Sequence, residues 1–336
     1  MTAVDGSARL WAMAHLGTPM AIRVAATLRI ADHIAAGRRT VPELARAAGA
    51  DADALERLLR FLVAKGVFGR DDSGRHHLTD LGEPLLDDHP AHLREMLDIE
   101  GAVGRAELSF VELLHSVRTG EAAYPAHFGR PFWEDMAAEP GRAASFDARM
   151  AADLARRAPG IVAGYDWGSL GHVVDVGGGD GSLLIALLTA HPSLRGSVVD
   201  LPDTAEAARK ALAAAGLADR ADAVPGSFFD PLPPGAGGYL LSSILHNWGD
   251  EAARAILRRC AEAAGPHGAV LVVEALGADG ESPPPTLDLR MLAYYGGRER
   301  GLSELGALAA DAGLVVAGTH PAGESSIVEL RIPARP

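Results

Sequence analysis

The chain has 336 residues, which is long enough for a large core and about two domains. Its formal net charge of −13 argues against a nucleic-acid partner, because a nucleic-acid-binding face is normally basic. A single cysteine, Cys260, excludes an intramolecular disulfide, and no apolar run reaches the roughly 20 residues of a membrane span. The N-terminus lacks the pattern of a signal peptide, so we expect a cytoplasmic protein.

The N-terminal part of the sequence has the pattern of a winged helix. Thr40 followed by Pro42 and Glu43 is a typical helix start, with a capping hydroxyl, a proline in the first turn and a carboxylate. Asp51 caps a second helix that carries leucines on one face. Two short segments that flank the polar tip at residues 71–74 indicate a hairpin. Helix, helix and wing predict a winged-helix domain that is all-helical apart from the wing.

From about residue 170, apolar strands alternate with amphipathic helices, which is typical of a doubly wound α/β domain. The strands are expected near residues 172–176, 197–199, 222–224, 239–243, 269–273, 314–317 and 327–332. The helices are expected near residues 182–190, 203–215, 250–264 and 303–312. We therefore place a winged-helix domain at residues 1–100 and a Rossmann-like α/β domain at residues 101–336, with a helical substrate-pocket segment over 101–165.

A glycine-rich turn follows the first of these strands. Four of the five residues Gly177–Gly181 are glycine, so a ligand can lie directly on the backbone. The dinucleotide fingerprint does not fit, because the third glycine comes one residue early, and a P-loop would need a lysine. The turn is similar to the D-V-G-G-G-x-G turn of methyltransferases that use S-adenosylmethionine (SAM).

The next two strands end in residues that suit a nucleoside. Asp200 lies about 20 residues after the turn, where a carboxylate accepts hydrogen bonds from ribose hydroxyls. Phe228 offers a flat face for adenine, and the hydroxyl of Ser227 could meet its exocyclic amine. A capping role for Asp200 and a core role for Phe228 are the alternatives.

His246 follows the fourth strand, and ligands in open α/β sheets bind beyond the carboxyl ends of the strands. A histidine titrates near pH 6.5 and can remove a proton from a phenol, whose pKa is about 10, as methyl transfer develops. Glu274 and Glu299 are candidates to orient this base, although a cap and a solvated charge are the simpler interpretations. No cluster of possible ligands has metal-ligand spacing, so we expect no metal ion.

Several other runs resemble the bacterial and plant small-molecule O-methyltransferases that carry a winged-helix dimerisation domain. These runs span residues 118–120, 129–135, 145–147, 165–167, 287–292 and 296–298, and the resemblance covers nearly the whole chain. They are most similar to the anthracycline-type aromatic polyketide branch, the group of carminomycin 4-O-methyltransferase and aclacinomycin hydroxylase. The resemblance implies a seven-stranded class I methyltransferase domain, an intertwined homodimer, SAM as methyl donor and S-adenosylhomocysteine (SAH) as product.

The resemblance also implies the functional residues and an activity, the methylation of a phenolic hydroxyl on a polycyclic aromatic metabolite in antibiotic biosynthesis. The expected cofactor-binding residues are Asp175, Gly177, Gly179, Asp200, Leu201, Ser227, Phe228, Ser242 and Trp248. The expected catalytic residues are His246, as general base, with Glu274, Glu299 and Asn247. Trp133, Phe146, Met150, Met291 and Tyr295 are expected to line the substrate pocket, with core packing as the alternative.

Two departures from the family pattern leave a second activity open. Ser227 stands where the family usually has aspartate, and Asn247 stands where the common H-D-W triplet has aspartate. The anthracycline branch includes SAM-binding members that hydroxylate or decarboxylate, and these often lack the histidine but have the asparagine. This chain has both residues, and the retention of His246 favours methylation over hydroxylation or decarboxylation.

A DNA-binding regulator is the third hypothesis for a winged helix. The candidate recognition helix, residues 53–65, carries Arg57, Arg60 and Lys65. Leucines on its other face require burial, and the acidic wing tip would repel phosphate. The sequence therefore favours an enzyme.

Overall fold

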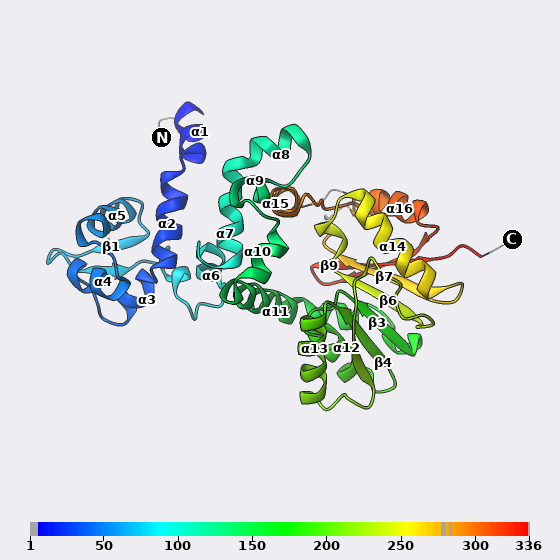
Figure 1. The fold of residues 1–336 in the computed structure, drawn as a ribbon. Coiled ribbons are helices and arrows are strands. Elements are labelled where there is room, and N and C mark those ends of the chain that lie inside the picture. The colour runs from blue at the N-terminus through cyan, green and yellow to red at the C-terminus, as the bar shows by residue number, and fades with distance from the viewer. Residues whose placement is uncertain (1–5, 277–279, 282–283, 335–336) are drawn as a thin grey trace. The chain divides into compact units, whose positions relative to one another are not determined.

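The computed structural model describes residues 6–276, 280–281 and 284–334, so the outermost residues of both expected domains lie outside the described residues. The chain forms two compact units (Figure 1). The first holds Met1–Leu108 and Trp133–Arg149, and the second holds Ser109–Phe132 and Met150–Pro336. The bridging helices are thus shared between the units, and a domain boundary at residue 100 stays a prediction.

The first unit is helical with one hairpin. Its elements are α1 (Gly6–Ala14), α2 (Gly17–Thr27), α3 (Ile30–Ala35), α4 (Val41–Ala48), α5 (Ala52–Ala64), β1 (Phe68–Arg70), β2 (His76–Leu78), η1 (Glu83–Leu85), α6 (Leu93–Leu97), α7 (Ala102–Leu108) and most of α10 (Phe132–Ala138). Helix α4 begins as predicted, since Glu43 Oε2 accepts the backbone N–H of Thr40 at 2.9 Å. Strands β1 and β2 pair antiparallel, so the predicted wing is present.

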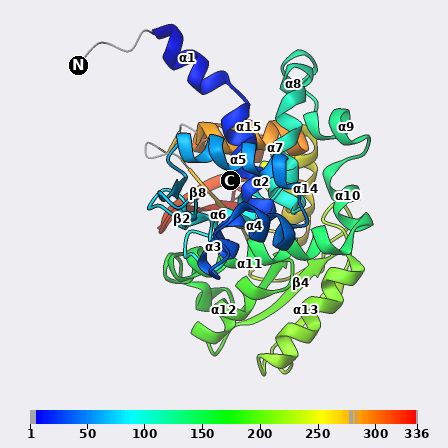
Figure 2. The same ribbon diagram turned by 90° about the vertical axis from the view of Figure 1, so that its left-hand side faces the viewer.

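Helix α1 buries none of its residues. Leu10, Trp11 and Met13 are all largely exposed. Figure 2 shows α1 extending beyond the end of α2. A single chain therefore leaves an apolar helix open to solvent.

The second unit contains a seven-stranded sheet in the order β5-β4-β3-β6-β7-β9-β8. Its strands are β3 (His172–Val176), β4 (Arg195–Asp200), β5 (Ala221–Pro225), β6 (Gly238–Ser242), β7 (Ala269–Glu274), β8 (Val315–Ala322) and β9 (Ser325–Arg331). Strand β9 runs antiparallel to both of its neighbours, β7 and β8, and the other described pairings in this sheet are parallel. The Rossmann-like fold and its seven strands are confirmed.

Helices cover both faces of the sheet (Figure 1). Successive strand residues face opposite layers of these helices. Val174 and Val176 pack with α14 (Asp250–Ala264) and α16 (Leu302–Asp311), whereas Val173 packs with the other layer. That other layer consists of α11 (Pro140–Ala163), α12 (Ser182–Ala190) and α13 (Pro202–Ala214). Both faces of the sheet are buried, as is usual for parallel strands.

The order of the strands creates a switch point beside β3. From β3 the chain moves outward through β4 to β5, and then crosses to β6 and β7 on the other side. The loops after β3 and β6 therefore leave in opposite directions, and a ligand crevice forms at such a point. The glycine turn follows β3 and the His246 segment follows β6, so both lie at this crevice.

The remaining elements of the second unit are mostly helical. They are η2 (Ser109–Glu112), α8 (Leu113–Thr119), α9 (Ala123–Phe128), η3 (Trp167–Leu170), η4 (Leu245–Asn247) and α15 (Pro285–Tyr295). Helix α15 is absent from the expected helices because prolines precede it, and proline suits a first helical turn as well as a loop. Among the residues that the structure describes, no helix is both long and apolar enough to cross a membrane.

Candidate active site

The glycine turn is held in a conformation that side chains would disrupt. Gly177, Gly179 and Gly181 have φ angles of 74°, 60° and 79°, in the left-handed region that favours glycine. A Cβ atom on Gly177 would lie 2.7 Å from Ile244 Cδ1. A Cβ atom on Gly178 would lie 2.6 Å from the carboxyl of Asp175. The turn is therefore a shallow cradle of bare backbone at the end of β3.

Asp200 connects this cradle to the end of β4. Its Oδ2 accepts the backbone N–H of Gly179 at 2.9 Å, and its Oδ1 accepts that of Leu201 at 2.7 Å. The side chain of Leu201 is 61% exposed at the start of α13. The carboxylate is thus fixed at the edge of the crevice, where a ribose could reach it.

Asp175 lies beneath the turn and is almost fully buried. Burial, together with the negative charges of Asp200 and Asp180, raises its pKa to about 7. Its Oδ2 is buried without a hydrogen-bond partner among the described residues. A buried acceptor of this kind suits a ligand that brings positive charge or an N–H donor to the cradle.

Two loops meet at the expected adenine end of the crevice. The ring of Phe228 lies 5.0 Å from that of Phe229 and 5.7 Å from that of Trp248, measured between centroids. The hydroxyl of Ser227 accepts the backbone N–H of Phe229 at 3.2 Å, so it stabilises the loop after β5. Ser242 is the last residue of β6. An adenine here would meet an edge-to-face aromatic cluster.

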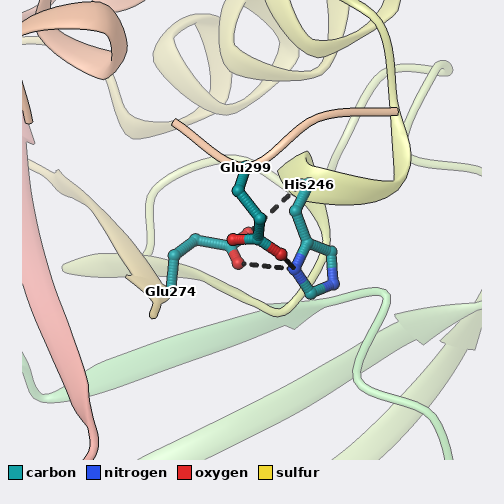
Figure 3. Close-up of side chains that lie close together, drawn as sticks. All are labelled: His246, Glu274 and Glu299. Carbon is teal, nitrogen blue, oxygen red and sulfur yellow. Dashed lines mark hydrogen bonds and ion pairs between the residues drawn. The ribbon is translucent and has the colours of Figure 1, made fainter. Parts of the chain in front are cut away.

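His246 lies on η4, between a carboxylate at the end of β7 and a carboxylate from the loop between α15 and α16. Its Nδ1 is 2.8 Å from Glu299 Oε1 and 3.1 Å from Glu274 Oε2 (Figure 3). Glu274 ends β7, and its Oε1 also accepts the backbone N–H of Leu245 at 3.1 Å. Because Nδ1 faces both acids, Nε2 points away from them (Figure 3) and is the ring atom that can accept a proton.

Burial and charge act in opposite directions on this histidine. Burial alone would lower the pKa of His246, but Glu274 and then Glu299 outweigh it, and the pKa is raised despite an opposing effect of Arg157. Burial raises the pKa of Glu274, and Glu299 adds to the increase. The three side chains are 16%, 9% and 1% exposed, so their charges are poorly screened. The result is a histidine that is more basic than a free imidazole.

Asn247 follows His246 in the sequence, but its side chain binds the backbone and not the two carboxylates. Its Nδ2 donates to the backbone carbonyl of Ser243 at 3.2 Å. Ser243 has a φ of 56°, which is unusual for a residue with a side chain. Asn247 therefore stabilises the strained start of the turn, and a catalytic role for it stays a prediction.

The same three side chains of His246, Glu274 and Glu299 also bear on the expectation of no metal ion. One possible ligand atom from each lies within 4.8 Å of the others. Their spacing in the sequence gives no sign of this, because three separate elements supply them. The expectation of no metal stays a prediction.

The expected pocket residues divide between the two units. Trp133 and Phe146, in the first unit, pack edge to face with ring centroids 5.4 Å apart. In the second unit Met291 is buried on α15, and Tyr295 packs against Phe132 at 4.9 Å. Met150 is 42% exposed on α11. Their role as pocket walls stays a prediction.

Sequence reasoning missed the segment that holds Glu299 in place. The backbone N–H of Glu299 donates to Asp288 Oδ1 at 2.9 Å. Arg300 is buried and binds backbone carbonyls on both sides of His246. In the sequence, Arg300 looks like a solvated charge, and only the two glycines at positions 296 and 297 indicate a close backbone approach.

Comparison with known families agrees with this geometry. Residues 110–315 match the family model of the O-methyltransferase domain. The chain belongs to the O-methyltransferase family. Residues 12–88 match the O-methyltransferase dimerisation domain, which covers the predicted winged helix.

Relatives within this O-methyltransferase family have more than one activity. A 2,7-dihydroxy-5-methyl-1-naphthoate 7-O-methyltransferase from Streptomyces carzinostaticus is 59% identical over 321 residues, which are 96% of this chain and 96% of that protein. Aclacinomycin 10-hydroxylase RdmB from Streptomyces purpurascens is 46% identical over 323 residues, which are 94% of this chain and 86% of that protein.

A crystal structure of an O-methyltransferase shows the same fold along its whole length. It is the structure of NcsB1, from neocarzinostatin biosynthesis, in complex with SAM and 2-hydroxy-5-methyl naphthoic acid. It matches with a TM-score of 0.93 and 57% identity, covering 99% of this chain and 100% of that chain. The resemblance to the aromatic polyketide branch is therefore confirmed.

Proposed function

We propose that this protein is a SAM-dependent O-methyltransferase that methylates a phenolic hydroxyl of a polycyclic aromatic acid, with His246 as general base. The observation that carries the proposal is the pair of carboxylates on Nδ1 of His246, which leaves Nε2 available as the base. The relatives named for a naphthoate and for a naphthoic acid support this acceptor class.

The residues at the crevice fit SAM. The bare backbone at Gly177 and Gly178 leaves room that a Cβ atom would fill, and the orphaned Oδ2 of Asp175 suits a cationic ligand. We assign the ribose to Asp200 and the adenine to the cluster of Phe228 and Trp248. When bound, SAM supplies a methyl group on a positively charged sulfonium, which becomes a neutral thioether when the methyl moves to oxygen.

In the proposed reaction, the residues of this chain remove the proton of the acceptor hydroxyl and position its oxygen. Nε2 of His246 accepts the proton of the acceptor hydroxyl while the oxygen forms its bond to the methyl carbon. The proton then remains on the imidazole, and Glu299 and Glu274 stabilise the resulting positive charge through Nδ1. Base catalysis of this kind contributes about 10²–10⁴-fold, and positioning supplies the rest.

A homodimer belongs to the same proposal. The dimerisation segment supports it, and the exposed apolar residues Leu10, Trp11 and Met13 of α1 lie at its start. We also propose a cytoplasmic location, which agrees with a single cysteine, Cys260, that is buried and free.

The second candidate function is hydroxylation or decarboxylation of the same class of substrate. The named hydroxylase at 46% identity and the asparagine at position 247 favour it. Mass spectrometry of the product distinguishes the two activities. Purified enzyme is incubated with SAM and a panel of hydroxynaphthoic acids and anthracyclines, in air. A product heavier by one CH2 supports methylation, and one heavier by an oxygen atom or lighter by CO2 overturns it.

The role of His246 needs its own variant. We expect His246→Ala to lower the methylation rate at least tenfold while SAH still binds with wild-type affinity in calorimetry. Full activity in this variant would remove the histidine from the mechanism, whereas lost SAH binding would show that the substitution disturbs the fold.

A further inference from the structure

Arg300 is a buried arginine that grips both ends of the turn bearing His246. Its Nη1 donates to the carbonyl of Leu245 at 3.0 Å, and its Nη2 donates to the carbonyl of Trp248 at 2.8 Å. These two carbonyls lie immediately before and two residues after His246. The side chain of Arg300 is only 6% exposed, so each of these charged hydrogen bonds is shielded from water.

The same guanidinium is anchored to the start of the next helix. Its Nε and Nη2 both donate to Asp250 Oδ1, at 3.1 and 2.8 Å. The charge of Arg300 lowers the pKa of Asp250, mainly through this hydrogen bond. Asp250 is the first residue of α14. The hydrogen bonds of Arg300, which we call the clamp, therefore join the His246 turn to a helix that packs on the sheet.

The backbone next to Arg300 also lies directly on the turn. A Cβ atom on Gly297 would be 2.1 Å from the carbonyl oxygen of His246 and 2.6 Å from the carbonyl carbon of Asn247. Only a glycine fits at this distance. The segment 297–300 thus touches the turn at both its ends, and between them Glu299 reaches Nδ1 of His246.

The turn gripped in this way connects two proposed functions. His246 is the proposed base, and Trp248 belongs to the aromatic cluster proposed for the adenine. A planar fork of N–H donors can hold two carbonyls and a carboxylate at once, which an ammonium group cannot do with the same geometry.

We propose that Arg300 is a positioning residue, which sets His246 against its two acids and Trp248 against the cofactor through a single clamp. The inference rests on the proposed function, because it deepens the role of the same site. A merely structural ion pair between Arg300 and Asp250 would stabilise α14 without affecting the chemistry of His246.

The test compares Arg300→Lys with the matched variant Arg254→Lys. Arg254 on α14 forms another arginine–aspartate pair, with Asp311 at the end of α16, at 3.0 Å. We expect Arg300→Lys to lower kcat at least tenfold and to raise the KM for SAM several-fold. We expect Arg254→Lys to leave both within about twofold of the wild type.

The pH profile separates positioning from loss of folded protein. The charged groups that face His246 are Glu274 from β7, Glu299 from the loop and Arg157 from α11, and all three are retained in the variant. If the clamp loosens, His246 moves away from its acids, so the acid limb of kcat against pH shifts to lower pH. A loss of activity that is equal at every pH, or no loss at all, overturns the proposal.

A second variant covers the case in which Arg300→Lys does not fold. Asp250→Asn keeps the charged side chain of Arg300 and weakens its hydrogen bonds to the start of α14. We therefore expect a smaller shift of the acid limb in the same direction. An unchanged acid limb in this variant overturns the proposal.

The test of Arg300 can be separated from that of the proposed function. NMR titration of the His246 ring, identified with His246→Gln, follows its pKa without turnover. A wild-type enzyme that binds SAH but methylates no acceptor would contradict the proposed function. The titration would still show whether Arg300 holds His246 beside its acids.

Discussion

His246 Nδ1 lies 2.8 Å from Glu299 Oε1, although the two residues are 53 positions apart in the chain. This contact has two consequences. It selects the tautomer in which Nδ1 carries the hydrogen, and it stabilises the positive charge that appears when Nε2 accepts a proton. The catalytic strength of the proposed base therefore depends on a carboxylate that does not touch the substrate oxygen.

Replacing that carboxylate tests the relationship. We expect Glu299→Gln to lower kcat about tenfold and to shift the acid limb of the pH profile to lower pH, because an amide still accepts the Nδ1 hydrogen but carries no charge. The measurement is kcat between pH 5 and 9. Glu262→Gln, an exposed glutamate paired with Arg259, is the control and should behave as wild type. An unshifted profile in Glu299→Gln would refute the electrostatic role.

The pH dependence of the wild type follows from the raised pKa of His246. Its ordinary pKa is 6.5, and the structure holds it above that value, so the protonated form persists to higher pH. Methylation should therefore increase with pH through an apparent pKa above 6.5. An apparent pKa below 6.5 in kcat against pH would contradict the prediction.

The protonation of His246 also stabilises the folded protein, and this stabilisation decreases as the pH rises. The contribution of His246 is fully present below pH 6.5 and is lost as the pH rises through its folded pKa, because the protonated ring gains more from the two acids than the neutral ring does. Urea unfolding of His246→Gln against the wild type, at pH 5.5 and pH 8.5, should show the larger difference at the lower pH.

Asp175 should make the SAM-free protein less stable as the pH rises. Its pKa is about 7 in the fold against an ordinary 3.8, so its contribution is complete below about pH 4 and is lost as the pH rises through about 7. Asp175→Asn should remove this dependence and, if SAM brings positive charge to the cradle, weaken SAH binding about tenfold. Urea unfolding and calorimetry measure the two effects. Asp180→Asn, an exposed acid of the same turn, should change SAH binding less.

Gly177→Ala should damage both the fold and the cofactor site. A left-handed alanine costs about 1–2 kcal/mol, and its Cβ would also collide with Ile244. Gly216 is a matched control, because its φ of 73° is similar and a Cβ there would meet nothing within 4 Å. We expect Gly216→Ala to lose comparable stability but retain SAH affinity. Equal SAH affinity in the two variants would show that the glycine turn does not bind the cofactor.

Much of the fold was predictable because its signals are local. The cap at Thr40, the alternation of strands and helices after residue 170 and the glycine turn each depend on neighbouring residues. Helix α15 was missed for the same reason, since its leading prolines suit both a loop and a helix start. The division of the bridging helices between two units depends on contacts that no local pattern encodes.

The sequence by itself determined that a nucleotide-like ligand can lie on bare backbone at Gly177–Gly181, because four of these five residues are glycine and carry no side chain. Only the tertiary structure decided which charges surround His246. Strand order places Glu274 beside it, and the packing of residues 297–300 on η4 brings Glu299 and Arg300 to its two sides. Backbone conformation is set by adjacent residues, whereas the pKa of a side chain is set by whatever the fold buries next to it.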